Sequence, residues 1–140
     1  LPLPIPNLKE MRIAVRTVNG EDVVFVQLGE EVPAVGKRIS DYKLPEAWRM
    51  RQGVYRTNDE ENQLLAIDSL ELKVNQQGFL MISMKTDTKD AQLGELVLYP
   101  LSDTEALIYA LGWRMMETIS MRQDADGEKL IFSGISFKKQ

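Results

Sequence analysis

The chain has 140 residues, a length that fits one domain of ordinary size. Apolar residues make up 44% and charged residues 27%, the balance of a folded globular protein rather than a disordered one. The net charge is −4, from 17 basic and 21 acidic residues, and no dense basic patch is present, which argues against a nucleic-acid partner.

The chain contains no histidine and no cysteine, and this excludes several kinds of site. Zinc sites built on imidazole or thiolate, Ser-His-Asp and Cys-His nucleophile systems, disulfide bonds and thiol redox motifs all need one of these residues. No apolar run approaches the roughly 18–20 residues that a membrane-spanning helix needs. We therefore expect no metal, no cofactor and no membrane span.

The first residues alternate with proline, at Pro2, Pro4 and Pro6. Such a stretch favours extended polyproline geometry and cannot join a central strand. We predict that residues 1–8 are a linker from an upstream domain and that residues 9–140 form a single β-barrel domain. A native N-terminus produced by processing is the alternative.

Alternation of apolar and polar residues dominates the rest, and turn signals come about every ten residues. Asn19-Gly20 is the strongest of these signals, because both central residues of a type I′ turn need positive φ. The pattern predicts about nine strands, nearly all in hairpins, in addition to a short strand at 37–40. They cover residues 11–15, 22–28, 53–57, 70–74, 79–85, 96–101, 106–111, 116–123 and 129–138.

One helical turn is predicted over Leu44–Met50, where Pro45 suits the first helical position and Glu46 complements the helix dipole. Trp48 has no strand partner there and is expected to fill the open mouth of a barrel. The fold predicted is all-β: an antiparallel meander that closes into a lipocalin-like β-barrel of about 8–9 strands, because closure removes exposed strand edges.

The predicted last strand is apolar on both faces. Leu130 and Phe132 fall on one face, and Ile131, Ile135 and Phe137 fall on the other. An outer apolar face of this kind predicts that another part of the protein packs on it, either the helical turn or a neighbouring domain.

Two short motifs could suggest chemistry, and neither has the context it needs. Ser40–Lys43 and Ser136–Lys139 match Ser-x-x-Lys, which requires the serine at a helix N-terminus with the lysine one turn on. Pro45 disfavours a helix through Lys43, and Ser136 lies in a predicted strand. We therefore predict no catalytic residues in this chain.

Asp124, Asp126 and Glu128 surround Gly127 and could suggest a calcium loop. Gly127 follows Asp126 directly, which is not the spacing of an EF-hand, so a hairpin turn is the better interpretation. The frequent methionines, Met84 and Met115 among them, could line an adaptable pocket, although soft filler in a barrel core explains them better.

Four segments in the same order resemble the C-terminal β domain of bacterial serine hydrolases of the β-lactamase and penicillin-binding-protein-like superfamily. They are similar to that domain's Pro-x-x-Trp…Gly-x-Tyr, Pro-x-Ser-Asp-Thr-Glu, Gly-x-Gly-Arg-Gly-Glu-Thr and Leu-x-Phe-Ser-Gly segments. The matching residues are Leu44–Trp48 with Gly53–Tyr55, Leu98–Glu105, Gly112–Arg114 with Glu117–Ile119, and Leu130–Phe137. Trp113 and Met115 depart from the pattern, because the family has small residues there.

The resemblance implies a non-catalytic accessory domain that packs on, or gates, an upstream catalytic domain of the same chain. It also implies an extracytoplasmic location, periplasmic or secreted. The alternative is a lipocalin-like binder of a small apolar ligand. The candidate docking or ligand surface comprises Trp113, Met115, Tyr99 and Phe137.

Overall fold

The computed structural model describes residues 11–27, 30, 34–39, 41–57, 67–86, 92–109 and 117–140. The chain divides into two compact units, Leu1–Asp41 and Tyr42–Gln140. The predicted linker over residues 1–8 lies outside the described residues.

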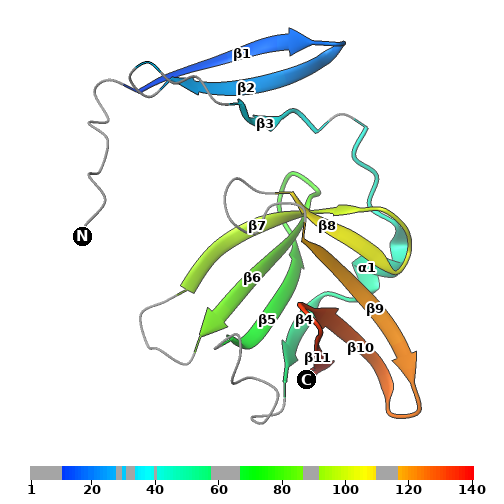
Figure 1. Cartoon of the computed structure of the whole chain (residues 1–140). Helices are drawn as coiled ribbons and strands as arrows, with labels where there is room; N and C mark the ends of the chain where they lie inside the picture. Colours follow the sequence, from blue (N-terminus) through cyan, green and yellow to red (C-terminus); the bar gives the residue numbers. More distant parts are fainter. Residues whose placement is uncertain are drawn as a thin grey trace, which may run out of the picture. The chain divides into compact units, whose positions relative to one another are not determined.

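The first unit contains a three-stranded antiparallel sheet in the order β1-β2-β3 (Figure 1). Its strands are β1 (Arg12–Val18), β2 (Glu21–Gln27) and β3 (Ala34–Lys37). Asn19 and Gly20 join β1 to β2 with φ angles of 52° and 82°. Positive φ at both positions is the geometry of a type I′ turn, so the hairpin predicted at Asn19-Gly20 is confirmed.

The second unit is a closed antiparallel barrel of eight strands, with one short helix, α1 (Glu46–Met50) (Figure 1). Around the barrel the strands follow the order β10-β11-β4-β5-β6-β7-β8-β9. The predicted fold class is therefore confirmed. The strands are β4 (Gly53–Arg56), β5 (Ile67–Val74), β6 (Leu80–Thr86), β7 (Gln92–Pro100), β8 (Glu105–Tyr109), β9 (Thr118–Asp124), β10 (Gly127–Phe132) and β11 (Ile135–Lys139).

The extent of the barrel differs from the single domain expected over residues 9–140. Barrel strands begin at Gly53, and β1, β2 and β3 pair only with one another among the described strands. The physical reason is that alternation marks a segment as a strand with one apolar face but does not say which sheet the strand joins.

The predicted single strand over residues 129–138 is wrong, because a hairpin turn interrupts it. Ser133 and Gly134 have φ angles of 47° and 79° and reverse the chain between β10 and β11. Phe132 pairs with Ile135 and Leu130 pairs with Phe137, so all four side chains point into the barrel. The apolar outer face expected on this strand therefore does not exist.

The core of the barrel is formed by inward-facing side chains from all eight strands and by Trp48 from α1. Its members are Trp48, Tyr55, Ile67, Leu70, Leu72, Leu80, Ile82, Met84, Leu98, Ala106, Ile108, Ile119, Met121, Leu130, Phe132, Ile135 and Phe137.

Two residues of the outer face of β6, Met81 and Ser83, are also buried, at 7% and 3% exposure. Lys73 on β5 and Glu95 on β7 form an ion pair, and β6 lies between these two strands. The two flanking strands are roughly 10 Å apart, so the paired side chains must cross over β6. This crossing covers Met81 and Ser83.

Helix α1 closes one end of the barrel. The connections β5–β6, β7–β8 and β9–β10 lie at that end, because antiparallel neighbours turn at alternate ends. The side chain of Gln52, just after α1, accepts a hydrogen bond from the backbone N–H of Val74 at the end of β5. Lys139, at the end of β11, donates one to the carbonyl of Met50.

Candidate docking surface on the barrel

Four aromatic residues in successive ring contact form the feature that we call the aromatic patch: Tyr42, Phe79, Tyr99 and Tyr109. The first three lie near the α1 end of the barrel, and Tyr109 is the last residue of β8, which starts at that end. The ring of Tyr42 meets that of Phe79 edge-on, with centroids 4.8 Å apart, and that of Tyr99 at 5.9 Å. The rings of Tyr99 and Tyr109 lie 6.0 Å apart at 40°. All four residues are half-buried, so part of each remains on the surface.

Tyr42 fixes the patch to the backbone of the barrel. Its hydroxyl donates a hydrogen bond to the carbonyl of Leu98 at 2.8 Å and accepts one from the N–H of Leu80, also at 2.8 Å. Leu80 and Leu98 are partners in the β6–β7 ladder, so one phenol oxygen bridges the two strands. Burial raises the pKa of the Tyr42 phenol, while the hydrogen bond from Leu80 and the charge of Arg49 oppose the rise.

Tyr99 and Tyr109 differ from Tyr42 in their hydroxyl groups. They lie on the outer face of β7 and β8, at diagonal positions, because Tyr99 pairs with Leu107 and Val97 pairs with Tyr109. Among the described residues, neither hydroxyl makes a hydrogen bond. A half-buried tyrosine with an apolar ring and an unused hydroxyl is a common contact residue at protein interfaces.

The structure places the four residues predicted for the docking surface differently. Tyr99 belongs to the aromatic patch. Phe137 is wrong as a surface residue: it is fully buried in the core, since the turn at Ser133 and Gly134 reverses the facing of the following strand. Trp113 and Met115 lie outside the described residues.

The sequence analysis missed Tyr42, Phe79 and Tyr109, which come from three separate segments. Tyr42 precedes α1, and Phe79 lies in the β5–β6 connection. The signal that could have found Tyr109 was its alternation with Ile108, which points inward. No sequence spacing could have shown that Tyr42 packs against β7.

A second polar cluster lies beside α1 and ties the helix to the barrel. Arg51 contacts the carboxylate of Glu128 through Nε at 3.0 Å and Nη2 at 2.6 Å, and donates to the carbonyl of Asp103. The guanidinium also lies over the Trp48 ring, 5.2 Å from its centroid. Each donor nitrogen of this arginine makes a hydrogen bond within the chain, so the cluster attaches the helix to the barrel.

Tyr55 on β4 adds a further contact between the barrel and the residue that follows α1. Its hydroxyl donates to the carbonyl of Arg51 at 2.7 Å, and its side chain is almost fully buried. Burial raises the pKa of the Tyr55 phenol to about 12; the Glu128 carboxylate adds to the rise and the Arg51 guanidinium opposes it. A phenol held neutral in this way serves as a hydrogen-bond donor and not as a base.

The residues of the two Ser-x-x-Lys matches are not brought together as a nucleophile and base where they are described. Ser136 and Lys139 are three residues apart in β11, so their side chains leave opposite faces of the strand. Lys139 is bound to the carbonyl of Met50 at 3.3 Å. Ser40 lies outside the described residues.

The acidic residues around Gly127 are engaged by cations of the chain. Asp124 pairs with Lys129 at 2.5 Å, and Asp126 lies 3.9 Å from Lys129 and 3.7 Å from Lys138. The hydrogen bond from Lys129 lowers the pKa of Asp124. Asp124 also accepts the backbone N–H of Asp126 at 2.9 Å, the local bond of an aspartate turn. This geometry bears out the hairpin interpretation.

Two kinds of feature are absent from the described residues. No group of three or more acidic residues there could hold a metal ion. No described helix has the length and apolarity needed to cross a membrane.

Comparisons of the chain with family models, with curated proteins and with solved structures found no match.

Proposed function

We propose that the barrel is a non-catalytic accessory domain that packs on a serine hydrolase domain, of the β-lactamase and penicillin-binding-protein-like kind, in the same polypeptide. The proposal places the protein in a bacterium, outside the cytoplasm. The observation that carries the docking role is the aromatic patch, where Tyr99 and Tyr109 present partly exposed rings and hydroxyl groups with no partner in the described chain.

The positions of the resembling segments in the fold support the proposal. Trp48 from the first segment donates a hydrogen bond to the carbonyl of Ser102 in the second, and both contribute to the closed end of the barrel. The segment Leu130–Phe137 forms the β10–β11 hairpin. Where the structure describes them, the matching segments thus fall on residues that build the barrel and close its end, as expected if the resemblance reflects a shared fold.

The alternative, a lipocalin-like binder of a small apolar ligand, finds less support. Such a ligand needs an internal cavity of about 300 Å³ or more, and side chains lining a cavity of that size would have surface exposed to a solvent-sized probe. Ile82, Met84, Ile108 and Phe132 point into the barrel from three strands, β6, β8 and β10, and each is 0% exposed. A packed interior leaves the outer surface as the part available for binding.

The test uses the complete reading frame that contains this chain. A fluorescent penicillin, which acylates the serine of this class of hydrolase, should label the full-length protein outside residues 1–140 and leave the isolated chain unlabelled. Labelling within the isolated chain, or no labelled serine in the full-length protein, would refute the assignment.

The docking role has its own test. Tyr99→Ala with Tyr109→Ala should lower the thermal stability or the ester hydrolysis of the full-length protein, because large partly exposed rings contribute most at protein interfaces. Leu101→Ala is the matched control, since Leu101 is an exposed apolar residue of the same β7–β8 region, at 53%. An equal effect of the two variants would contradict a role for the aromatic patch.

A further inference from the structure

We propose that the free edge of β1 binds an extended polypeptide strand that carries two acidic residues four positions apart with apolar residues between them. The inference concerns the first unit, and it does not depend on the function proposed for the barrel. Three features of the sheet carry it: the backbone groups of β1, the apolar side chains on one face and the arginines on the other.

The first feature is the backbone of β1. Among the described strands β1 pairs with β2 alone, so its other side is an edge. In a hairpin with a two-residue turn, Val18 and Glu21 form a hydrogen-bonded pair, and such pairs then alternate with non-hydrogen-bonded ones. The N–H and C=O groups of Ile13, Val15 and Thr17 therefore point away from β2.

The position of β3 confirms this alternation independently. The N–H of Arg38 donates to the carbonyl of Asp22 at 2.7 Å, so the backbone of Asp22 points toward the β3 side. Asp22 is the partner of Thr17 in the β1–β2 ladder. Since Asp22 faces away from β1, Thr17 faces away from β2, as the turn geometry requires. An added antiparallel strand would satisfy these edge groups.

The second feature is an apolar strip on one face. Met11, Ile13 and Val15 lie on it, beside Val24 and Val26 of β2. Ile13 and Val15 are 64% and 63% exposed. An added strand with apolar residues opposite these two positions would extend the strip across three strands and cover part of it.

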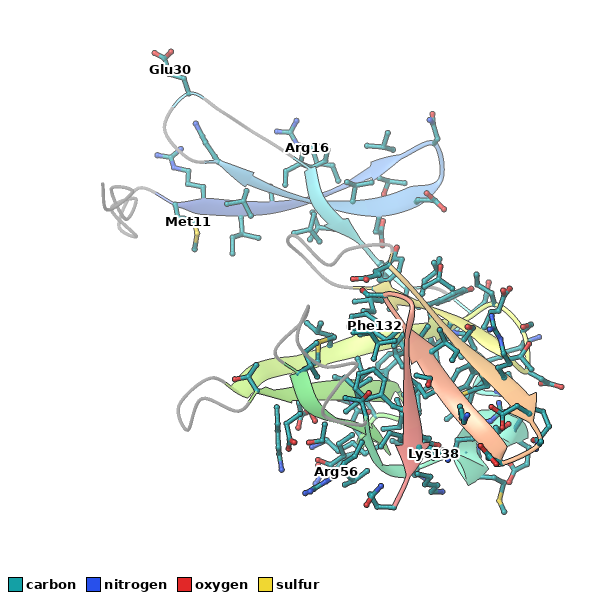
Figure 2. The ribbon with its side chains drawn as sticks, turned by 60° about the horizontal axis from the view of Figure 1, so that its bottom comes forward. Met11, Arg16, Glu30, Arg56, Phe132 and Lys138 are labelled. Atoms are coloured by element: carbon teal, nitrogen blue, oxygen red, sulfur yellow. The ribbon has the colours of Figure 1, made fainter. Side chains whose placement is uncertain are left out.

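The third feature is the charge on the opposite face. Arg12 and Arg16 project from that face at positions four apart, and Figure 2 shows Met11 and Arg16 on opposite sides of the hairpin. Both are exposed, and within the described residues neither has an acidic partner. Residues directly opposite each other on adjacent strands interact through their side chains, so acidic residues on the added strand would pair with both arginines.

This charge selects the occupant. A second copy of β1 would bring the same two arginines and no carboxylate from Arg12–Val18. An acidic strand supplies the missing opposite charge at the spacing that Arg12 and Arg16 define. The favoured pattern is acidic, apolar, any, apolar, acidic.

The test is a titration of the complete chain with the peptide acetyl-Thr-Glu-Val-Thr-Val-Glu-Thr-amide, followed by amide NMR shifts so that weak binding is measurable. Binding should shift and protect the amides of Ile13, Val15 and Thr17. A peptide with lysine in place of both glutamates should bind at least about tenfold more weakly than the acidic peptide, because it meets Arg12 and Arg16 with like charge.

Two variants separate the edge from the fold. Val15→Pro removes an outward-pointing N–H and no backbone group of the β1–β2 ladder, so it should abolish binding while that ladder stays formed, since proline is tolerated at a sheet edge in this orientation. Val15→Thr keeps the N–H but loses part of the apolar contact, so it should bind more weakly than the wild type and still measurably, unlike Val15→Pro. Arg12→Glu with Arg16→Glu should reverse the preference toward the lysine peptide.

Three results would overturn the proposal. One is no shift with the acidic peptide at about millimolar concentration, the range in which a single short strand is expected to bind. Another is equal binding of both peptides. The third is self-association of the chain in sedimentation that Val15→Pro abolishes, which would assign the edge to a second copy.

Discussion

The indole N–H of Trp48 donates a hydrogen bond to the carbonyl of Ser102 at 2.8 Å, and this bond joins helix α1 to the β7–β8 connection. The Trp48 side chain is fully buried, at 0% exposure, among core residues of the barrel. The ring thus closes the end of the barrel that the strands leave open.

Trp48→Ala should lower the free energy of unfolding by about 3–5 kcal/mol, because it removes a large buried ring and leaves a cavity and an unpaired carbonyl. Chemical denaturation of the isolated chain measures this loss. Met50→Ala is the control on the same helix; Met50 is 73% exposed, and its loss should stay within about 0.5 kcal/mol. Equal losses would show that Trp48 is not part of the core.

Tyr42→Phe tests the phenol bridge between β6 and β7. The change keeps the ring but leaves the N–H of Leu80 and the carbonyl of Leu98 without this partner. We expect a loss of about 1–3 kcal/mol in the free energy of unfolding, the cost of unsatisfied groups that are partly shielded from water.

Tyr109→Phe is the matched control for that change. Tyr109 belongs to the same aromatic patch, but its hydroxyl has no partner within the described chain. Its removal should leave the denaturation midpoint nearly unchanged. If Tyr42→Phe destabilises the chain no more than Tyr109→Phe does, the two hydrogen bonds of the Tyr42 hydroxyl add nothing to the stability of the barrel.

Gly134→Ala tests the hairpin turn that the alternation pattern failed to predict. Gly134 has a φ of 79°, and no atom lies within 4 Å of where a Cβ would stand, so the whole cost comes from the backbone conformation. A left-handed conformation costs an ordinary residue about 1–2 kcal/mol, and we expect a loss of that size.

Gly94→Ala provides the comparison for this turn. Its added Cβ would also meet nothing within 4 Å, and its φ is not in the left-handed region. Urea denaturation should find it close to the wild type. A cost-free Gly134→Ala would mean that β10 and β11 are not joined by this turn.

The residue pattern predicted local structure better than it predicted the arrangement of the strands. Pro45 and Glu46 marked the start of the helix, and Asn19-Gly20 marked the first hairpin, because each acts through the backbone of its own neighbours. Ser133-Gly134 was missed because serine rarely takes positive φ and apolar residues continue on both sides of the turn.

The candidate surface was less accessible to prediction for a related reason. The facing of Phe137 depends on whether the chain reverses before it, so one missed turn moved this residue from the core to the predicted surface. Tyr42 and Tyr99 meet only because α1 folds back onto the barrel end, a contact across 57 positions of the numbering that no local pattern encodes. Likewise, nothing in the alternation of Ile13 and Val15 separates the sheet of the first unit from the barrel.

Tyr55 should make the stability of the barrel depend on alkaline pH. Its pKa is raised from 10.0 in the unfolded reference to about 12 in the fold, first by burial and then by the charge of Glu128. As pH rises above about 10, the unfolded chain loses this proton while the folded chain keeps it, so the unfolded state is favoured. The contribution of the neutral phenol is complete below about pH 10 and is lost between about pH 10 and 12. Burial also raises the pKa of Tyr42, so a variant is needed to identify the group.

Tyr55→Phe isolates the contribution of this phenol. The variant should be less stable than the wild type at about pH 8, because the hydrogen bond from Tyr55 to the carbonyl of Arg51 is gone. Between about pH 10 and 12 its denaturation midpoint should fall less steeply than that of the wild type, so the two curves converge. Parallel curves for Tyr55→Phe would mean that the Tyr55 phenol ionises alike in both states, and that its burial against α1 does not hold it neutral.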